Sequence, residues 1–280
     1  MTIARGAVLG ILFAARAAGA QSDTLSSRYL FTWKDGLLAG AFVGATIAIA
    51  PLDKSLAEDL QVKSRQQSSR LQRAATGFRV VALPGSVIIG GSLYAVGRLT
   101  NSHRTADLGL HGTEALIIGE LTAATMKGFF GRQRPYVDTA EFNPYKWHFL
   151  GGFTSDDGQR SFPSGHSVAA FAAAAAAANE MSVWWPSLRW PVGAVMYGGA
   201  GMVGLSRMYN NRHWASDVIM GAAIGTFAGN KVVRYHHSHP GNQLDEWLVN
   251  FSITPATSGS GHLISASIFP RLRPTLARLR

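Results

Sequence analysis

The chain has 280 residues, of which 47% are hydrophobic and 15% are charged. This composition is sufficient for a large apolar core and excludes a disordered or fibrous protein. A net charge of +10 favours phosphate-rich partners such as nucleic acid, anionic lipid or phosphorylated substrates. Because the chain has no cysteine, disulfide scaffolds, cysteine nucleophiles and thiolate metal sites are excluded. We expect one domain with short appendages.

Residues 1–20 have the layout of a secretory signal peptide. A basic residue, Arg5, precedes an apolar stretch, and the small residues Ala18 to Ala20 stand where a signal peptidase would cut. Arg16 interrupts the apolar stretch, so an amphipathic N-terminal tail is the alternative. The favoured interpretation predicts export, with residues 21–248 as the helical domain.

Runs without charged side chains give the organisation of this domain. Four such runs cover residues 36–52, 80–97, 161–179 and 190–206, and two more apolar stretches with occasional charges cover 108–126 and 218–233. They predict six helices. Each is near the lower length limit for crossing a bilayer of about 30 Å, and their Gly and Ala content adds little to membrane insertion. A membrane bundle and a soluble bundle both remain possible.

The connectors differ in character. Residues 53–79 predict a partly buried amphipathic helix with apolar positions at Leu56, Leu60, Val62, Leu71 and Phe78. Residues 136–160 are aromatic and rich in turn formers, which predicts a loop at the mouth of a pocket. In residues 249–280, alternating residues and turn formers predict a short β-hairpin or an irregular tail.

Three motifs stand at ends of the predicted helices, where a bundle would bring them to one side. They are Lys127 with Arg134-Pro135, then Pro163-Ser164-Gly165-His166, then Ser206-Arg207 with His213 and Asp217.

The first property these motifs share is an affinity for a tetrahedral oxyanion. Lys127, Arg134 and Arg207 supply fixed cations, and guanidinium groups match phosphate oxygens in paired geometry. Ser164 supplies a hydroxyl, and Gly165 exposes a backbone N–H at a helix start, where the helix dipole also favours an anion. The motifs therefore predict a phosphate-binding site.

The histidines add chemistry to this site. His213 and Asp217 are four residues apart, so on a helix they share a face, and the carboxylate would hold one ring nitrogen as N–H while the other stays free as a nucleophile. His166 would lie across the anion and protonate a departing alkoxide. Two histidines beside a cationic anion-binding site predict covalent phosphoryl transfer.

Taken in order, the three motifs resemble the complete signature of the type 2 phosphatidic acid phosphatase and vanadium haloperoxidase superfamily. The resemblance implies an all-α fold with a six-helix bundle core. It also implies that His213 attacks phosphorus, that Asp217 orients it, and that His166 serves as acid and then as base. By the same resemblance, the nonbridging oxygens are bound by Lys127, Arg134, Ser164, Gly165 and Arg207, and the reaction needs no metal and no cofactor.

The expected substrate is a phosphorylated small molecule or a lipid phosphate or pyrophosphate, and not nucleic acid. One alternative is a vanadate-dependent haloperoxidase, in which vanadate would be the cofactor, and another is a non-catalytic anion-binding protein. We expect an exported protein of the periplasm or cell envelope, with an integral membrane protein as the alternative.

Two further sets of polar residues have less specific patterns. His236, His237 and His239 have no carboxylate at matching spacing, which favours a solvated helix end over a metal site. A second set lies on or next to the third predicted helix and consists of Asp107, His111, Glu114 and Glu120. Its spacing favours a structural hydrogen-bond network over a direct function.

Overall fold

The structure is a computed structural model that describes residues 30–239, 251–258 and 261–268. The predicted leader at residues 1–20 lies outside the described residues. Within them the helices are α2 (Trp33–Ile49), α3 (Asp53–Leu60), α4 (Lys63–Gln66), α5 (Ser69–Val80), α6 (Ser86–Leu99), α7 (His103–Phe130), α8 (Gly165–Trp184), α9 (Arg189–Tyr209) and α10 (Ala215–Ser238).

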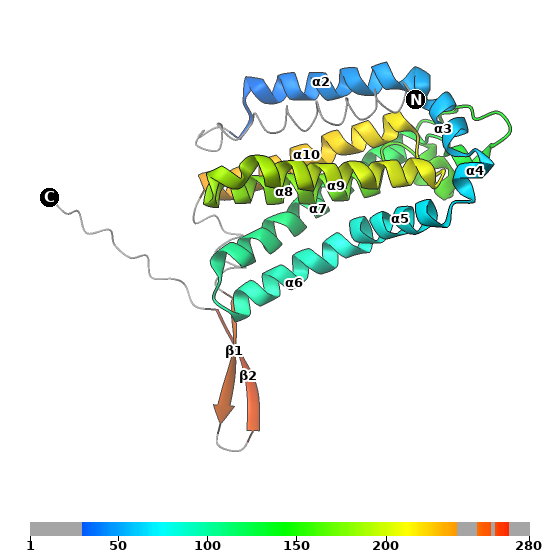
Figure 1. The fold of residues 1–280 in the computed structure, drawn as a ribbon. Coiled ribbons are helices and arrows are strands. Elements are labelled where there is room, and N and C mark those ends of the chain that lie inside the picture. Colours follow the sequence, from blue (N-terminus) through cyan, green and yellow to red (C-terminus); the bar gives the residue numbers. More distant parts are fainter. Residues whose placement is uncertain (1–29, 240–250, 259–260, 269–280) are drawn as a thin grey trace.

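The predicted all-α class is confirmed. Each of the six apolar stretches coincides with one helix, namely α2, α6, α7, α8, α9 or α10. The C-terminal part forms a hairpin, in which β1 (Phe251–Ser258) pairs antiparallel with β2 (Gly261–Ile268) and projects away from the helices (Figure 1). The division of the chain at residue 248 stays a prediction.

The first connector differs from its prediction, because residues 53–79 form three helices in place of one. The chain is extended at Val62, with ψ at 133°, and the side chain of Gln66 donates to the Leu60 carbonyl at 2.8 Å. That bond replaces a helical hydrogen bond at the end of α3. Leu56 is buried as predicted, but Val62 and Leu71 are 47% and 45% exposed.

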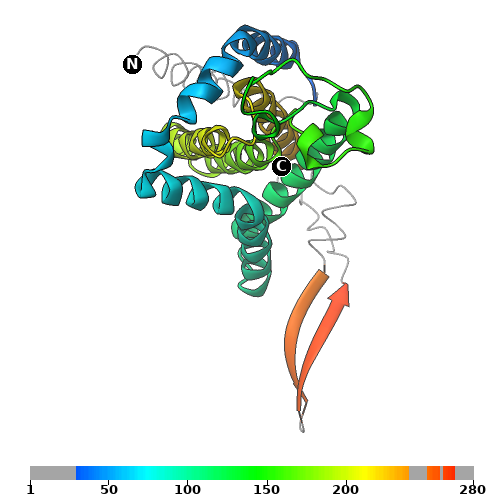
Figure 2. The same ribbon diagram turned by 90° about the vertical axis from the view of Figure 1, so that its right-hand side faces the viewer.

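Helix α8 lies at the centre of the bundle, packed against α7, α9 and α10 (Figures 1 and 2). Its alanines make this possible, because small side chains allow neighbouring helices to approach closely. On α10 the facing positions are Gly221, Gly225 and Gly229, and a Cβ atom on Gly225 would lie 2.3 Å from the Val168 carbonyl oxygen. The close contact between α8 and α10 therefore depends on glycine.

The direction of the helices brings four helix ends together. Helices α7 and α9 end where α8 and α10 begin, so their terminal residues meet at one end of the bundle. Gly131 ends α7 in the left-handed conformation, with φ at 52°. Ser164 caps α8 by accepting from the backbone N–H of Ser167 at 3.4 Å. The three sequence motifs therefore meet at this end.

The contact between α8 and α10 gives a stability test. Gly225→Ala should lower the free energy of unfolding by about 1–3 kcal/mol, because the added methyl overpacks the interface. Gly112→Ala on α7 is the control, since a Cβ atom there meets nothing within 4 Å and alanine favours the helix. Thermal unfolding of both variants measures the difference, and equal midpoints would contradict the packing argument.

Candidate active site

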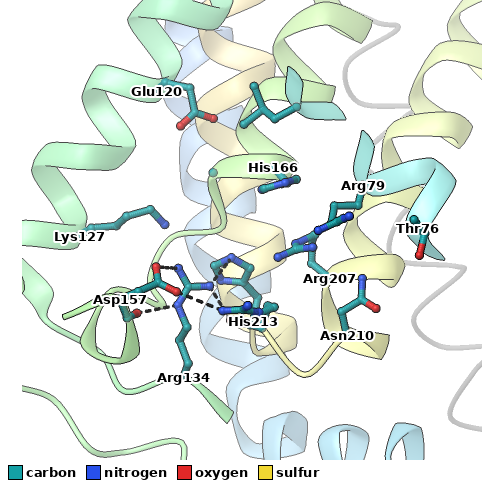
Figure 3. A pocket seen from close by; sticks show the side chains of 13 residues that line it. Thr76, Arg79, Glu120, Lys127, Arg134, Asp157, His166, Arg207, Asn210 and His213 are labelled. Carbon is teal, nitrogen blue, oxygen red and sulfur yellow. Dashed lines mark hydrogen bonds and ion pairs between the residues drawn. The ribbon is translucent and has the colours of Figure 1, made fainter. Parts of the chain in front are cut away.

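A cavity of about 670 Å³ opens at the end of the bundle where the motifs meet. Figure 3 shows Lys127 and Arg134 on one side, Arg79 and Arg207 opposite, and the two histidines between them. The motif residues that line the cavity are Lys127, Arg134, Gly165, His166, Arg207 and His213. Its other lining residues are Thr76, Arg79, Leu83, Glu120, Asp157, Asn210 and Arg212.

His213 is held in one tautomer by its neighbours. Its Nδ1 atom lies 2.8 Å from the Ser161 carbonyl oxygen, and its Nε2 atom lies 3.2 Å from Nη1 of Arg134. A carbonyl only accepts and a guanidinium only donates, so the proton is on Nδ1 and a lone pair is on Nε2. Burial lowers the pKa of His213 well below its usual value, and Asp217 opposes this only in part. The ring is therefore neutral, with Nε2 directed into the cavity.

Asp217 acts on His213 less directly than its spacing predicts. His213 lies before α10, in the loop after α9, so the two residues do not share a helical face. The Asp217 Oδ2 atom is 3.6 Å from His213 Nδ1, whereas it accepts from the Ser161 hydroxyl at 2.5 Å and from the Trp214 backbone N–H at 2.9 Å. Asp217 thus fixes the segments on both sides of the histidine. The carbonyl oxygen of Ser161 accepts the hydrogen bond from Nδ1–H of His213.

Behind Asp217 lies a buried ion pair network that the sequence analysis missed. Arg132 donates to Asp217 at 2.6 Å and to Asp53 at 2.8 Å. Asp53 also accepts from the Ser216 backbone N–H at 2.9 Å. Arg132 and Asp53 are only 2% and 1% exposed. One signal for Asp53 was present in the sequence, because this acidic residue directly follows the first apolar run. The partners of Asp53 could not be predicted, since they come from segments distant in the chain.

Arg134 is positioned by a residue of the long connector. The Asp157 carboxylate accepts from Arg134 at 2.7 Å and from Arg212 at 3.1 Å, and the Asp157 carbonyl oxygen accepts from Nε of Arg134 at 2.8 Å. The aromatic connector therefore shapes the mouth of the cavity, as predicted. It also brings in Asp157, which the sequence analysis did not select.

Three other polar groups at the cavity differ in how they are paired. Lys127 donates to the backbone carbonyls of Pro163 and Arg160. Among the described residues, neither Arg207 Nε nor Glu120 Oε1 has a hydrogen-bond partner, although both atoms are buried. Buried polar atoms in this condition are uncommon in proteins. A bound molecule with an anionic part would give the Arg207 guanidinium its missing acceptor.

The two remaining motif residues lie at the start of α8. His166 faces the cavity, as Figure 3 shows, whereas the Ser164 side chain is fully buried and is bonded to the Ser167 hydroxyl at 2.9 Å. Ser164 therefore caps the helix and does not line the cavity. The backbone at Gly165 does line it. The structure thus brings most of the predicted site residues together, and their catalytic roles stay predictions.

The fold and the cavity together define a helical protein with a cavity lined by five cationic side chains and two histidines. The PAP2 superfamily model matches residues 110–239. The matched segment carries both histidines and the cationic motif residues, in agreement with the resemblance that the three motifs give.

Individual relatives match shorter or more divergent parts. A lipid A 1-phosphatase from Porphyromonas gingivalis is 43% identical over 72 residues, which are 25% of this chain and only 15% of that relative's length. The transmembrane PAP2-type phosphatidylglycerolphosphate phosphatase of Bacillus subtilis has a TM-score of 0.52 and 23% identity, over 72% of this chain and 94% of that one. Aquifex aeolicus LpxE has a TM-score of 0.45 and 21% identity, over 64% and 92%. The Bacillus structure supports the fold.

The buried network gives a second prediction. Asp53→Ala should lower the free energy of unfolding by about 3–5 kcal/mol, because it leaves Arg132 with one of its two buried carboxylates. Asp59→Ala, in the same helix, removes an exposed ion pair with Arg65 and should cost at most about 1 kcal/mol. Denaturant unfolding of both variants provides the measurement, and a smaller loss for Asp53→Ala than for Asp59→Ala would refute the assigned role.

Proposed function

We propose that this chain is a phosphatase that hydrolyses a phosphate monoester through a phosphohistidine intermediate on His213. The observation that carries the proposal is the Nε2 lone pair of a neutral imidazole, directed into a cavity with cationic walls. A nucleophile must be unprotonated to attack, and phosphate oxygens need positive partners. His213 meets the first condition, and the arginines around it meet the second.

The reaction proceeds in two balanced steps. His213 Nε2 forms a bond to phosphorus while the ester P–O bond breaks, and His166 gives a proton to the departing oxygen. A water molecule then attacks phosphorus, its proton passes to His166, and the N–P bond breaks to release inorganic phosphate. His166 is thereby returned to its protonated state, as acid–base catalysis requires.

The charge around the cavity supports this chemistry. Five of its lining side chains are cationic and two are acidic, so a phosphoryl group would enter a strongly positive environment. Because the cations are fixed by the bundle and by Asp157, they need little reorganisation when charge develops on the phosphoryl oxygens. Burial and the neighbouring Arg207 lower the pKa of His166 to about 3, and the substrate phosphate would oppose this shift by adding negative charge nearby.

We further propose that the helices lie in a membrane. Residues Trp33–Leu60 and Ser69–Leu99 are long and apolar enough to cross one, and only 22% and 17% of their most apolar windows are buried within the protein. Large apolar side chains on α6, among them Ile88 and Ile89, face outward. Exposed faces of this kind suit a lipid environment better than water.

The connector after α7 adds an aromatic group at the end of the bundle that carries the cavity. Tyr145, Phe149 and Phe153 are each more than half exposed. Aromatic side chains concentrate at the membrane–water boundary, where the lipid headgroups lie. The cavity would then open at headgroup level, and the lipid A 1-phosphatase among the relatives agrees with a lipid phosphate as the substrate. We propose that the protein lies in the cell envelope, where the predicted leader at residues 1–20 would direct it.

The two histidines should respond differently to substitution. His213→Asn should abolish the phosphoenzyme, whereas His166→Asn should still form it with a phenolic leaving group, which needs little protonation. The reaction is quenched without acid, and mass spectrometry of the protein then detects the phosphohistidine adduct. His148→Asn, an exposed histidine that does not line the cavity, is the control. Phosphoenzyme formation by His213→Asn at the parent rate would overturn the proposal.

The substrate class has its own test. Purified protein in vesicles should release phosphate faster from a lipid phosphate monoester than from a water-soluble one, because the proposed membrane position concentrates lipid at the cavity. The same preparation is given peroxide, bromide and vanadate. Halogenation without phosphate release would establish the haloperoxidase alternative, and phosphate binding without turnover would establish an anion-binding protein.

A further inference from the structure

A second polar cluster lies inside the bundle, far from the phosphate cavity. Glu180 is near the C-terminal end of α8, whereas His166 is near the N-terminal end of the same helix. The two residues are fourteen positions apart, which corresponds to about 21 Å at the helical rise. His111 comes from the first half of α7, and His237 from the last turn of α10. Three helices therefore bring their polar residues to one point.

The carboxylate of Glu180 is shared by the two histidines. Its Oε1 atom lies 2.5 Å from Nδ1 of His111, and its Oε2 atom lies 3.0 Å from Nε2 of His237. The side chains of Glu180 and His111 are 0% and 5% exposed, and that of His237 is 28% exposed. The donor atoms of the three residues lie within 4.8 Å of one another. The cluster is therefore buried, with one ligand accessible from solvent.

We propose that His111, Glu180 and His237 form a binding site for a divalent transition metal of the zinc type. Two imidazoles and one carboxylate are a donor set that proteins use for Zn²⁺ with a further position left for water. Metal–ligand bonds of about 2.1 Å place tetrahedral ligand atoms about 3.4 Å apart, so the three donors need only small rotations to reach this geometry. The cation would offset a carboxylate that is otherwise buried in the apolar bundle.

A second layer of contacts supports the same site. The ring of His236 stacks on that of His111 with 4.1 Å between centroids, and its Nε2 atom lies 2.7 Å from Glu114. Such outer contacts fix the orientation of metal-binding histidines. The partly exposed ring of His237 provides a route for the ion to enter. The sequence favoured a solvated helix end here because no carboxylate stands at a suitable spacing; Glu180 comes from a helix more than fifty residues earlier.

The test uses the full chain, purified in detergent, stripped by a chelator and then dialysed against Zn²⁺ or Co²⁺ alone. We expect about one ion per chain, a visible Co²⁺ spectrum typical of four or five ligands, and a raised unfolding temperature with Zn²⁺. His237→Ala should weaken binding at least about tenfold. His239→Ala, an exposed histidine in the same segment but outside the donor set, should bind like the parent.

Two further variants make the result specific. Glu180→Gln keeps the shape of the side chain, and it should also lose the ion. His213→Asn should lose the phosphoenzyme but retain the ion, which separates this proposal from the proposed function. Failure of the parent protein to retain Zn²⁺ or Co²⁺ would overturn the metal site. The three residues would then form only a hydrogen-bonded cluster. Equal binding by His237→Ala and His239→Ala would overturn the assigned ligands.

Discussion

The geometry of the cavity around His213 depends on one buried cation, Arg132, held between the carboxylates of Asp53 and Asp217. A buried charge that loses its partner costs several kcal/mol, so these three groups hold each other in a fixed arrangement. Asp217 then fixes Ser161, whose carbonyl oxygen accepts a hydrogen bond from Nδ1–H of His213. In this way, four segments are joined behind His213: the start of α3, the segment after α7, the segment before α8 and the start of α10.

This arrangement separates two kinds of positive charge. Arg132 is neutralised by acids and is almost fully buried, so it contributes position and little attraction for a ligand. Arg207 faces the cavity, and its Nε atom has no partner among the described residues. Arg134 belongs to both groups, because it bonds Asp157 and also donates toward His213. The cavity can therefore attract an anion strongly while His213 stays neutral.

Much of this site follows from the sequence, and the exceptions have physical causes. The motifs fall at helix ends, and antiparallel neighbours in a bundle must bring such ends together. His213 and Asp217 lie close together, as their spacing predicts, but His213 precedes α10, so its Nδ1 atom is 3.6 Å from Asp217 and only 2.8 Å from the Ser161 carbonyl oxygen. Arg132 and Glu180 were missed because each has its partners on segments distant in the chain. The predicted network on α7 is found at His111 and Glu114, whereas Glu120 lines the cavity beside His166 and His213.

The central claim is that the cavity binds a phosphoryl group with Nε2 of His213 at its phosphorus. Orthovanadate adopts the five-coordinate geometry of that transition state, so a crystal structure of the protein with vanadate tests the claim most directly. The account predicts vanadium bonded to His213 Nε2, with its equatorial oxygens contacting Arg207 and Arg134 and an apical oxygen facing His166. Vanadate bound elsewhere, or a His213 ring turned so that Nδ1 faces the cavity, would contradict it.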